Sequence, residues 1–329
     1  MNGTYLSLLS AVGPVFVMIA AGWGMRRVSW LTEEADASLL RVVVNLLFPC
    51  LILDTILGNR ALEDAGNLLL APAVGFGTIV FGYGLTYLAA PVFGVRSPRA
   101  RRTFAFTTGM YNYGYIALPL VQKLFDQPAG DARTSGVLFI HNLGVEVALW
   151  TVGIVLISGG AKTAGESGGL RARCRHLLNA PVVTIVLAVA LHFTGARVWL
   201  PAFVLSAVHG LGLAGLPLAL VLTGATFADE MRGVTLRNST ADSLGALVLR
   251  LGVLPLCFLA LARWLPCPIE LRRIIVVQAA MPCAMVPVIL SKHYGGDPAL
   301  SLRIVLVTTA LALLTIPLWI QVGQRWIGG

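Results

Sequence analysis

The chain has 329 residues, of which 57% are hydrophobic and 12% are charged. An average soluble protein has about 25% charged residues. A soluble fold of this length cannot bury so much apolar surface, which excludes a soluble enzyme, a nucleic-acid-binding protein and a disordered chain. A bilayer-spanning helix needs about 20 apolar residues, so the composition predicts an all-α polytopic membrane protein. Its net charge of +9 is attributed to basic residues in cytoplasmic loops.

Ten apolar segments, separated by connectors that contain Gly, Pro or charged residues, are expected to span the membrane. They are residues 4–24, 37–57, 68–94, 102–125, 136–158, 178–195, 201–227, 243–265, 271–292 and 299–322. The longest polar stretch, 159–177, is predicted to be a cytoplasmic linker. It separates a first five-helix unit, residues 1–158, from a second one, residues 178–329.

The Lys and Arg residues between these segments favour one orientation. More of them lie in the loops that face inward when the N-terminus is outside, and cytoplasmic loops are enriched in such residues. Both termini are therefore expected on the outer side of the cytoplasmic membrane. Because each half has an odd number of spans, two halves related by duplication would have opposite orientations, as the inverted repeats of secondary transporters do.

The fourth and ninth segments, each the fourth of its half, contain residues that interrupt helices. One has Tyr111-Asn-Tyr-Gly-Tyr115 followed by Pro119, and the other has Met281-Pro-Cys-Ala-Met-Val-Pro287. Proline removes a helical hydrogen bond, and backbone groups freed at membrane depth must face protein or a water-filled cavity. The breaks therefore predict a substrate cavity, with Asn112, Tyr113, Tyr115, Pro119, Pro282 and Pro287 as candidates. The alternative is that these are ordinary prolines and glycines of membrane helices.

The fifth segment contains an acidic residue within its apolar stretch. Glu146 lies about ten residues into it, which at about 1.5 Å per residue is close to the bilayer midplane. A carboxyl group there must be protonated, paired or in contact with water. Asn142, four residues earlier, lies on the same helix face. Glu146 is therefore a candidate for proton coupling, with Asn142 at the substrate, and the alternative is a structural carboxyl group bonded to a neighbouring helix.

Two basic residues also fall within segments. Arg250 lies about seven residues into the eighth, where it is expected either near an anionic substrate or paired with a carboxylate such as Glu146. Arg41, Asn45 and Pro49 follow one another at intervals of four in the second segment and are predicted to form one polar stripe. Arg41 is close enough to the cytoplasmic end for its side chain to reach the interface.

Motifs of metalloproteases, P-loop nucleotide sites and metal sites are absent from the sequence, which has no HExxH, no Walker A loop and no spaced Cys/His set. We therefore expect neither catalysis nor a cofactor or metal. Several glycines are instead expected to allow close helix packing, namely Gly75, Gly77, Gly82 and Gly84.

Motifs along the whole chain resemble the auxin efflux carrier family, which belongs to the bile/arsenite/riboflavin transporter superfamily. They are Asn112-Tyr-Gly-Tyr-Ile-Ala-Leu-Pro119, Phe139-Ile-His-Asn-Leu-Gly-Val-Glu146, Leu149-Trp-Thr-Val-Gly153, Leu216-Pro-Leu-Ala219 with Gly224, the segment from Pro282 to Pro287, and Tyr294-Gly-Gly-Asp297. The short central linker is similar to that of bacterial members.

The resemblance implies a ten-helix fold of two inverted five-helix repeats, similar to sodium–proton antiporters and bile-acid symporters. In such a fold spans 1, 2, 6 and 7 form a scaffold, and spans 3–5 and 8–10 form a moving domain. Broken helices 4 and 9 would cross near Pro119 and Pro287, with Asn112 beside the substrate. The sequence departs from its relatives at Cys283-Ala-Met285, where polar residues are common, so the second half of the site is expected to be less polar.

The function that the resemblance implies is secondary transport of a small organic anion or weak acid, such as an auxin-like acid or a carboxylate, across the cytoplasmic membrane. An elevator-type movement driven by the proton gradient or the membrane potential is expected. The alternatives are a sodium-coupled symporter of the bile-acid type and a transporter-like channel or sensor. Expected partners are the substrate, protons, lipid and a second copy bound through the scaffold helices, without nucleic acid.

Overall fold

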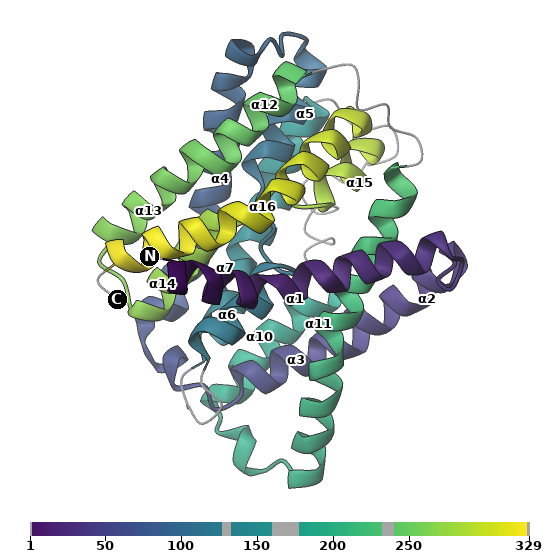
Figure 1. Ribbon diagram of the computed structural model, residues 1–329. Coiled ribbons are helices and arrows are strands. Elements are labelled where there is room, and N and C mark those ends of the chain that lie inside the picture. Colours follow the sequence, from purple (N-terminus) through teal and green to yellow (C-terminus); the bar gives the residue numbers. More distant parts are fainter. Residues whose placement is uncertain (1, 127–132, 160–177, 232–239, 328–329) are drawn as a thin grey trace.

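The computed structural model describes residues 2–126, 133–159, 178–231 and 240–327. Within these ranges the chain is helical, and its only strand-like feature is one isolated bridge. Almost all of the predicted linker 159–177 lies outside the described residues. Both ends of the chain lie on the same side of the molecule in Figure 1, where the start of the first helix is next to the end of the last.

The described residues include seven helices that are long and apolar enough to cross a membrane. They are Tyr5–Arg27, Glu33–Ile56, Gly66–Phe93, Thr134–Ser158, Ala202–Glu230, Ala241–Trp264 and Pro298–Trp326. These correspond to predicted segments one, two, three, five, seven, eight and ten. The sixth is a shorter apolar helix, α10 (Ala180–Phe193). The prediction of an all-helical polytopic membrane protein is therefore confirmed.

Three of the long helices are regular along most of their length. They are α1 (Asn2–Arg27), α11 (Ala202–Glu230) and α16 (Pro298–Trp326). The other four contain a wider π-helical turn, which adds one residue to the turn. The second span consists of α2 (Glu33–Val42), η1 (Val43–Leu47) and α3 (Phe48–Ile56), and the third of η3 (Gly66–Leu70), α4 (Ala71–Ala89) and the 3-10 turn η4 (Ala90–Phe93). The fifth consists of α7 (Thr134–Ala148), η5 (Leu149–Gly153) and α8 (Ile154–Ser158), and the eighth of α12 (Thr240–Val248), η8 (Leu249–Val253) and α13 (Leu254–Trp264). Two further 3-10 turns lie in connectors, at η2 (Arg60–Glu63) and η6 (Ala196–Val198).

The fourth and ninth predicted segments are each divided into two short helices. The fourth consists of α5 (Pro98–Gly109) and α6 (Ala117–Phe125), and the ninth consists of α14 (Ile269–Ala280) and α15 (Val286–His293). The predicted interruptions of both segments are therefore present. Residues 110–116 and 281–285 form the two breaks.

The helices pack in two groups. In the α11 group, α1 lies along α11, and α3 contacts both α10 and α11. In the α14 group, α4 contacts α5 and α7, while α14 contacts α7, α13 and α16, and α16 also contacts α5, α12 and α15. Contacts of α1 with α16 and of α3 with α7 join the groups. Figure 1 shows α4, α5, α12, α13 and α15 above the purple α1.

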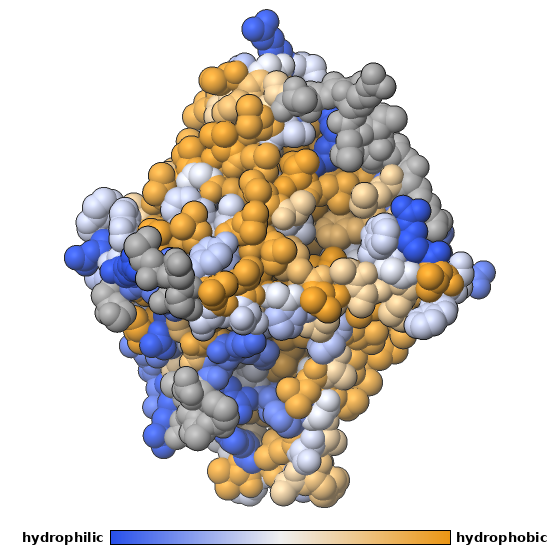
Figure 2. All heavy atoms as spheres, viewed as in Figure 1, coloured by the Kyte–Doolittle hydropathy of each residue, from blue (hydrophilic) through white to orange (hydrophobic). Residues whose placement is uncertain are grey.

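The outer surface is rich in apolar side chains, as a bilayer requires. Hydrophobic residues cover most of the face in Figure 2, and polar residues gather mainly toward its edges. Leu88, Trp199 and Phe203 are among the large apolar side chains that are at least 72% exposed. A soluble monomer rarely exposes apolar patches of this extent, so the surface agrees with the composition.

Glycines allow the closest helix approaches. A Cβ atom at Gly22 of α1 would overlap the Val221 carbonyl of α11, and one at Gly224 would overlap the Ile19 carbonyl of α1. Small residues let membrane helices approach at backbone distance, so this pair holds α1 against α11.

The prediction of close packing is confirmed for two of the four glycines on α4. A Cβ at Gly75 would overlap the His141 carbonyl of α7, and one at Gly82 would meet the Gly109 carbonyl of α5. The prediction is wrong for Gly77 and Gly84, where an added Cβ has nothing within 4 Å. Gly75 and Gly82 lie seven residues apart, on the face of α4 that packs against α7 and α5, whereas an added Cβ at the other two would meet no neighbouring helix within 4 Å.

Candidate functional site

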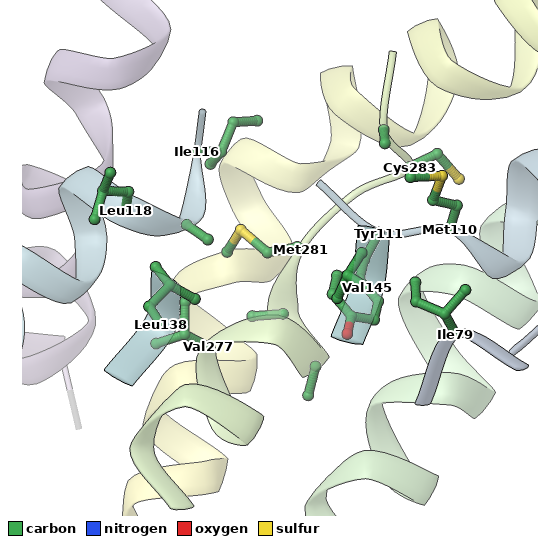
Figure 3. Packing of buried hydrophobic residues seen from close by; sticks show 14 of the residues in the cluster. Ile79, Met110, Tyr111, Ile116, Leu118, Leu138, Val145, Val277, Met281 and Cys283 are labelled. Carbon is green, nitrogen blue, oxygen red and sulfur yellow. The ribbon is translucent and has the colours of Figure 1, made fainter. Parts of the chain in front are cut away.

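The two helix breaks lie side by side and bond to each other. Tyr111 and Cys283 form an antiparallel bridge. The Asn112 backbone N–H donates to the Pro282 carbonyl at 2.8 Å, and the Ala284 N–H donates to the Met110 carbonyl at 3.0 Å. Figure 3 shows Met110, Tyr111, Met281 and Cys283 among the buried side chains at this crossing. Each break therefore satisfies backbone groups that the other leaves free, as burial at membrane depth demands.

The predicted prolines lie in or next to the breaks. Pro282 is inside the second break, whereas Pro287 is in the first turn of α15. Pro119 is the third residue of α6. The first turn of a helix tolerates proline because its N–H groups have no helical acceptor. Pro119 and Pro287 therefore help to start the second half-helices, and the bridged residues at the crossing are Tyr111 and Cys283.

A cavity of about 180 Å³ lies at the crossing, between the α11 group and the α14 group. It is lined by Val44, Phe48, Asn112, Tyr113, Gly114, Tyr115, Leu118, Phe139, Asn142, Glu146, Pro181, Val182, Ile185, Leu216, Ala284, Met285 and Val286. The structure thus brings five of the predicted candidates together, from two separate segments: Asn112, Tyr113, Tyr115, Asn142 and Glu146.

Amide side chains hold the first break in place. The Asn112 side-chain oxygen accepts from the Ile116 N–H at 3.2 Å, at the start of α6. The Tyr113 carbonyl accepts from Asn142 Nδ2 at 3.1 Å and from Gln278 Nε2 at 3.3 Å. Gln278 comes from α14 and is 2% exposed. Amides from both halves therefore set the position of the Tyr113 backbone beside the cavity.

Glu146 is bonded to two neutral donors. Its Oε1 accepts from the Tyr113 hydroxyl at 2.6 Å, and its Oε2 accepts from Trp150 Nε1 at 2.9 Å. Among the described residues Glu146 has no ion pair with a Lys, Arg or His side chain. The carboxyl group therefore lies at the cavity wall with two neutral hydrogen-bond donors and, among the described residues, no cation fixed beside it.

The part of the cavity wall that comes from the second half is apolar. Ala284, Met285 and Val286 belong to the second break and the start of α15, and Leu216 comes from α11. All polar side chains of the cavity come from residues 112–146. The polar side chains of the site therefore come from the first half alone, and the residues that the second half contributes suit the hydrocarbon part of a ligand.

The other predicted residues lie outside the cavity. Arg250 is fully buried and donates to the backbone carbonyls of Gln278, Ala279 and Met281, so the structure brings it neither to the cavity wall nor to Glu146. Arg41 and Asn45 are exposed, and Asn45 Nδ2 donates to the Arg41 carbonyl at 2.9 Å. Pro49 is half-buried one turn further on. The predicted stripe thus runs along the outside of the second span.

A family model described as membrane transport protein matches residues 7–320. The chain belongs to this family, the auxin efflux carriers. It is 26% identical over 319 residues to an uncharacterized transporter of Methanothermobacter thermautotrophicus, which covers 96% of this chain and 98% of the relative. It is 23% identical over 310 residues to an uncharacterized transporter of Methanocaldococcus jannaschii, which covers 93% and 95% of the two chains. The carrier is therefore an integral membrane transporter, as its helices indicate.

Some residues of this auxin efflux carrier family member were missed in the sequence. Trp150 is four residues after Glu146, a spacing that places both on one helix face, and this signal could have identified it. Gln278 carried no such signal because its partner, the Tyr113 carbonyl, lies far away in the chain. The π-helical turns also indicate that this region is functional, since such turns are frequent at functional sites. Val44, Trp150 and Arg250 lie in three of them.

Proposed function

We propose that this chain is a secondary carrier that moves a small organic anion or weak acid across the cytoplasmic membrane. The observation that carries the proposal is the cavity at the two paired breaks, which combines polar side chains from the first half with apolar side chains from both halves. A carboxylate can accept hydrogen bonds from amides and hydroxyls at the polar wall, and an apolar body fits against Met285 and Phe48. The half-helices α6 and α15 begin at this cavity, and helix N-termini favour negative charge.

The proposed arrangement has ten spans in two inverted five-helix repeats. It is supported by the seven long helices, by the apolar α10 and by the interrupted pairs α5–α6 and α14–α15. Each interrupted pair is the fourth element of its half, which is the sequence sign of a site between inverted repeats. The start of α1 contacts α16, where the Tyr5 hydroxyl donates to the Leu314 carbonyl at 3.1 Å, and both termini lie on one side of the molecule in Figure 1. An even number of spans accounts for this, and both termini are proposed to be outside.

The proposed movement is an elevator-type displacement of the α14 group against the α11 group. Supporting it, the cavity is lined from both groups, by Phe48 and Leu216 on one side and by the breaks on the other. A displacement between the groups would expose the cavity to each side of the membrane in turn. The α11 group would then be the scaffold, and its outer apolar surface the place where a second copy binds.

Two driving forces are proposed. A single negative charge gains about 2.3 kcal/mol per 100 mV when it leaves a negative interior, which favours export. Glu146 supplies a proton-binding group beside the substrate, so that proton movement can be coupled to anion movement. Coupling through Glu146 would allow import against the membrane potential.

Saturable counterflow in proteoliposomes tests the carrier proposal. Purified protein is screened by thermal shift against indole acetate and dicarboxylates, and any acid that stabilises it is then used as the labelled substrate. We expect trans-accelerated exchange that saturates. Single-channel currents with no counterflow would contradict a carrier and favour a channel.

Replacing Asn112 is expected to weaken substrate binding. Asn112→Asp keeps an oxygen that can accept from the Ile116 N–H, but its negative charge opposes an anion. We expect the Kd of the stabilising acid to rise about tenfold or more, which corresponds to about 1.4 kcal/mol. Gln122→Ala, on α6 but outside the cavity, is the matched control. Equal affinity in Asn112→Asp and the wild type would contradict the assignment of Asn112.

A further inference from the structure

A buried arginine closes the end of a half-helix beside the substrate cavity. Arg250 lies in the π-helical turn η8 and is 0% exposed. Its Nε donates to the Met281 carbonyl at 2.9 Å, and its Nη2 donates to the carbonyls of Gln278 at 3.0 Å and Ala279 at 3.2 Å. These carbonyls lie in the last turn of α14 and at the start of the second break.

The break itself explains why these carbonyls need a donor. In a continuous helix the Gln278 carbonyl would accept from the N–H of residue 282, but Pro282 has none. The Gln278 carbonyl keeps a backbone donor at the end of α14, the Met281 N–H at 3.3 Å, and its second donor is Arg250. The Ala279 carbonyl would accept from the Cys283 N–H, which points instead to Thr308 Oγ1 at 3.4 Å. Free carbonyls at membrane depth are costly. The Arg250 guanidinium therefore replaces helical hydrogen bonds that Pro282 and the break remove.

The positive charge of Arg250 is compensated by dipoles and ring faces. The C-terminal end of a helix carries a partial negative charge. The guanidinium also lies over the rings of Tyr111 and Phe258, at 5.4 and 5.5 Å from their centres. Among the described residues it forms no ion pair with an acid. Its charge is thus directed at the end of α14, and not at Glu146.

A cluster of unwound carbonyls at a half-helix C-terminus is the kind of site at which secondary transporters bind a coupling sodium ion. Here a guanidinium already occupies the carbonyls. We infer that Arg250 is a tethered cation that takes the place of a coupling sodium ion, so that this carrier works without sodium. The consequence for coupling rests on the proposed function as a carrier, whereas the role of Arg250 at the α14 end does not.

The two breaks are held by different kinds of side chain. Its Tyr113 carbonyl is held by the neutral amides of Asn142 and Gln278, whereas the second break is held by a full charge. Arg250 is therefore a positioning residue. It holds the second break at the position where Ala284 bonds to the first, and it acts on the cavity through that contact.

Thermal unfolding of the purified full-length protein tests the inference without transport. The wild type is compared in sodium chloride and in choline chloride at equal ionic strength. We expect the same Tm in both salts. Arg250→Ala is expected to lower the Tm by several degrees, and sodium or methylguanidinium chloride, but not choline, is expected to restore part of the loss.

The matched control is Arg303→Ala. Arg303 on α16 is a mostly buried arginine that pairs with Asp242 at 3.0 Å, so its loss removes a charge without emptying a carbonyl cluster. We expect a lower Tm with no response to sodium or methylguanidinium. If Arg250→Ala does not fold, Arg250→Lys, which keeps a positive charge, is compared with Arg250→Met, which removes it. We expect the Tm of Arg250→Lys to lie between those of the wild type and Arg250→Met.

Three outcomes would overturn the inference. They are a wild-type Tm that rises specifically with sodium, an Arg250→Ala variant that responds to no cation, and an Arg250→Lys variant no more stable than Arg250→Met. A wild type that transports no acid in proteoliposomes would instead contradict the proposed function, while the unfolding results on Arg250 would stand.

Discussion

Glu146→Gln is expected to abolish proton-driven accumulation of the substrate while exchange across the membrane continues. If one proton moves with each anion, a pH difference of one unit gives about tenfold accumulation in the wild type, because one unit corresponds to about 1.36 kcal/mol. Glutamine cannot bind or release this proton in the physiological range. The accumulation driven by pH should therefore fall to the level of empty liposomes.

The geometry of the site allows this variant to fold. The glutamine oxygen can accept from Trp150 Nε1, and its amide group can donate to the Tyr113 hydroxyl, which both donates and accepts. The contacts at 2.9 and 2.6 Å are thus replaceable with their partners kept. Loss of coupling would then come from the missing titration and not from a collapsed site.

Substrate uptake by wild-type and Glu146→Gln proteoliposomes is compared with and without a pH gradient. Glu34→Gln is the matched control, since Glu34 is an exposed carboxylate in the first turn of α2, away from the cavity. Tyr113→Phe removes one donor to Glu146 but leaves the carboxyl group, so pH-driven uptake should persist. A pH profile of Glu146→Gln that matches the wild type would remove Glu146 from the coupling mechanism.

Gly144→Ala is expected to destabilise the fold strongly. A Cβ at Gly144 of α7 would overlap the Pro72 carbonyl of α4, and it would lie 2.8 Å from the Phe76 backbone nitrogen. Because both contacts are with backbone, relief requires the two helices to separate. Overpacking of this kind costs about 3 kcal/mol, and the shift would also move Asn142 and Glu146, which are two residues away on either side.

The yield of monodisperse protein and the Tm in detergent measure this effect. Gly77→Ala is the control on the partner helix α4, because an added Cβ there meets nothing within 4 Å. We expect Gly77→Ala to match the wild type and Gly144→Ala to fall below it by several degrees, with transport lost. Equal stability of the two variants would show that α4 and α7 do not depend on this close approach.

The sequence predicted where the site lies more completely than it predicted which contacts form the site. Asn112 and Glu146 were identified because a polar motif and an acidic residue stood out in apolar segments. The bond between Tyr113 and Glu146 was not foreseen, since it joins residues 33 positions apart. Arg250 was expected near an anion or a carboxylate, but its partners are carbonyls at the end of α14 whose usual helical hydrogen bonds are lost because α14 ends before Pro282.

By itself, the sequence determined that the chain lies in a membrane, where its apolar segments run and where two of them break. These features depend on local chemistry, because a bilayer requires apolar residues over a set length and proline lacks the N–H that a helix needs. Only the tertiary structure decided that the two breaks bond to each other, that Glu146 faces neutral donors and that Arg250 closes α14. Those contacts depend on which helices pack together, and backbone and side-chain groups far apart in the chain meet only after that packing is in place.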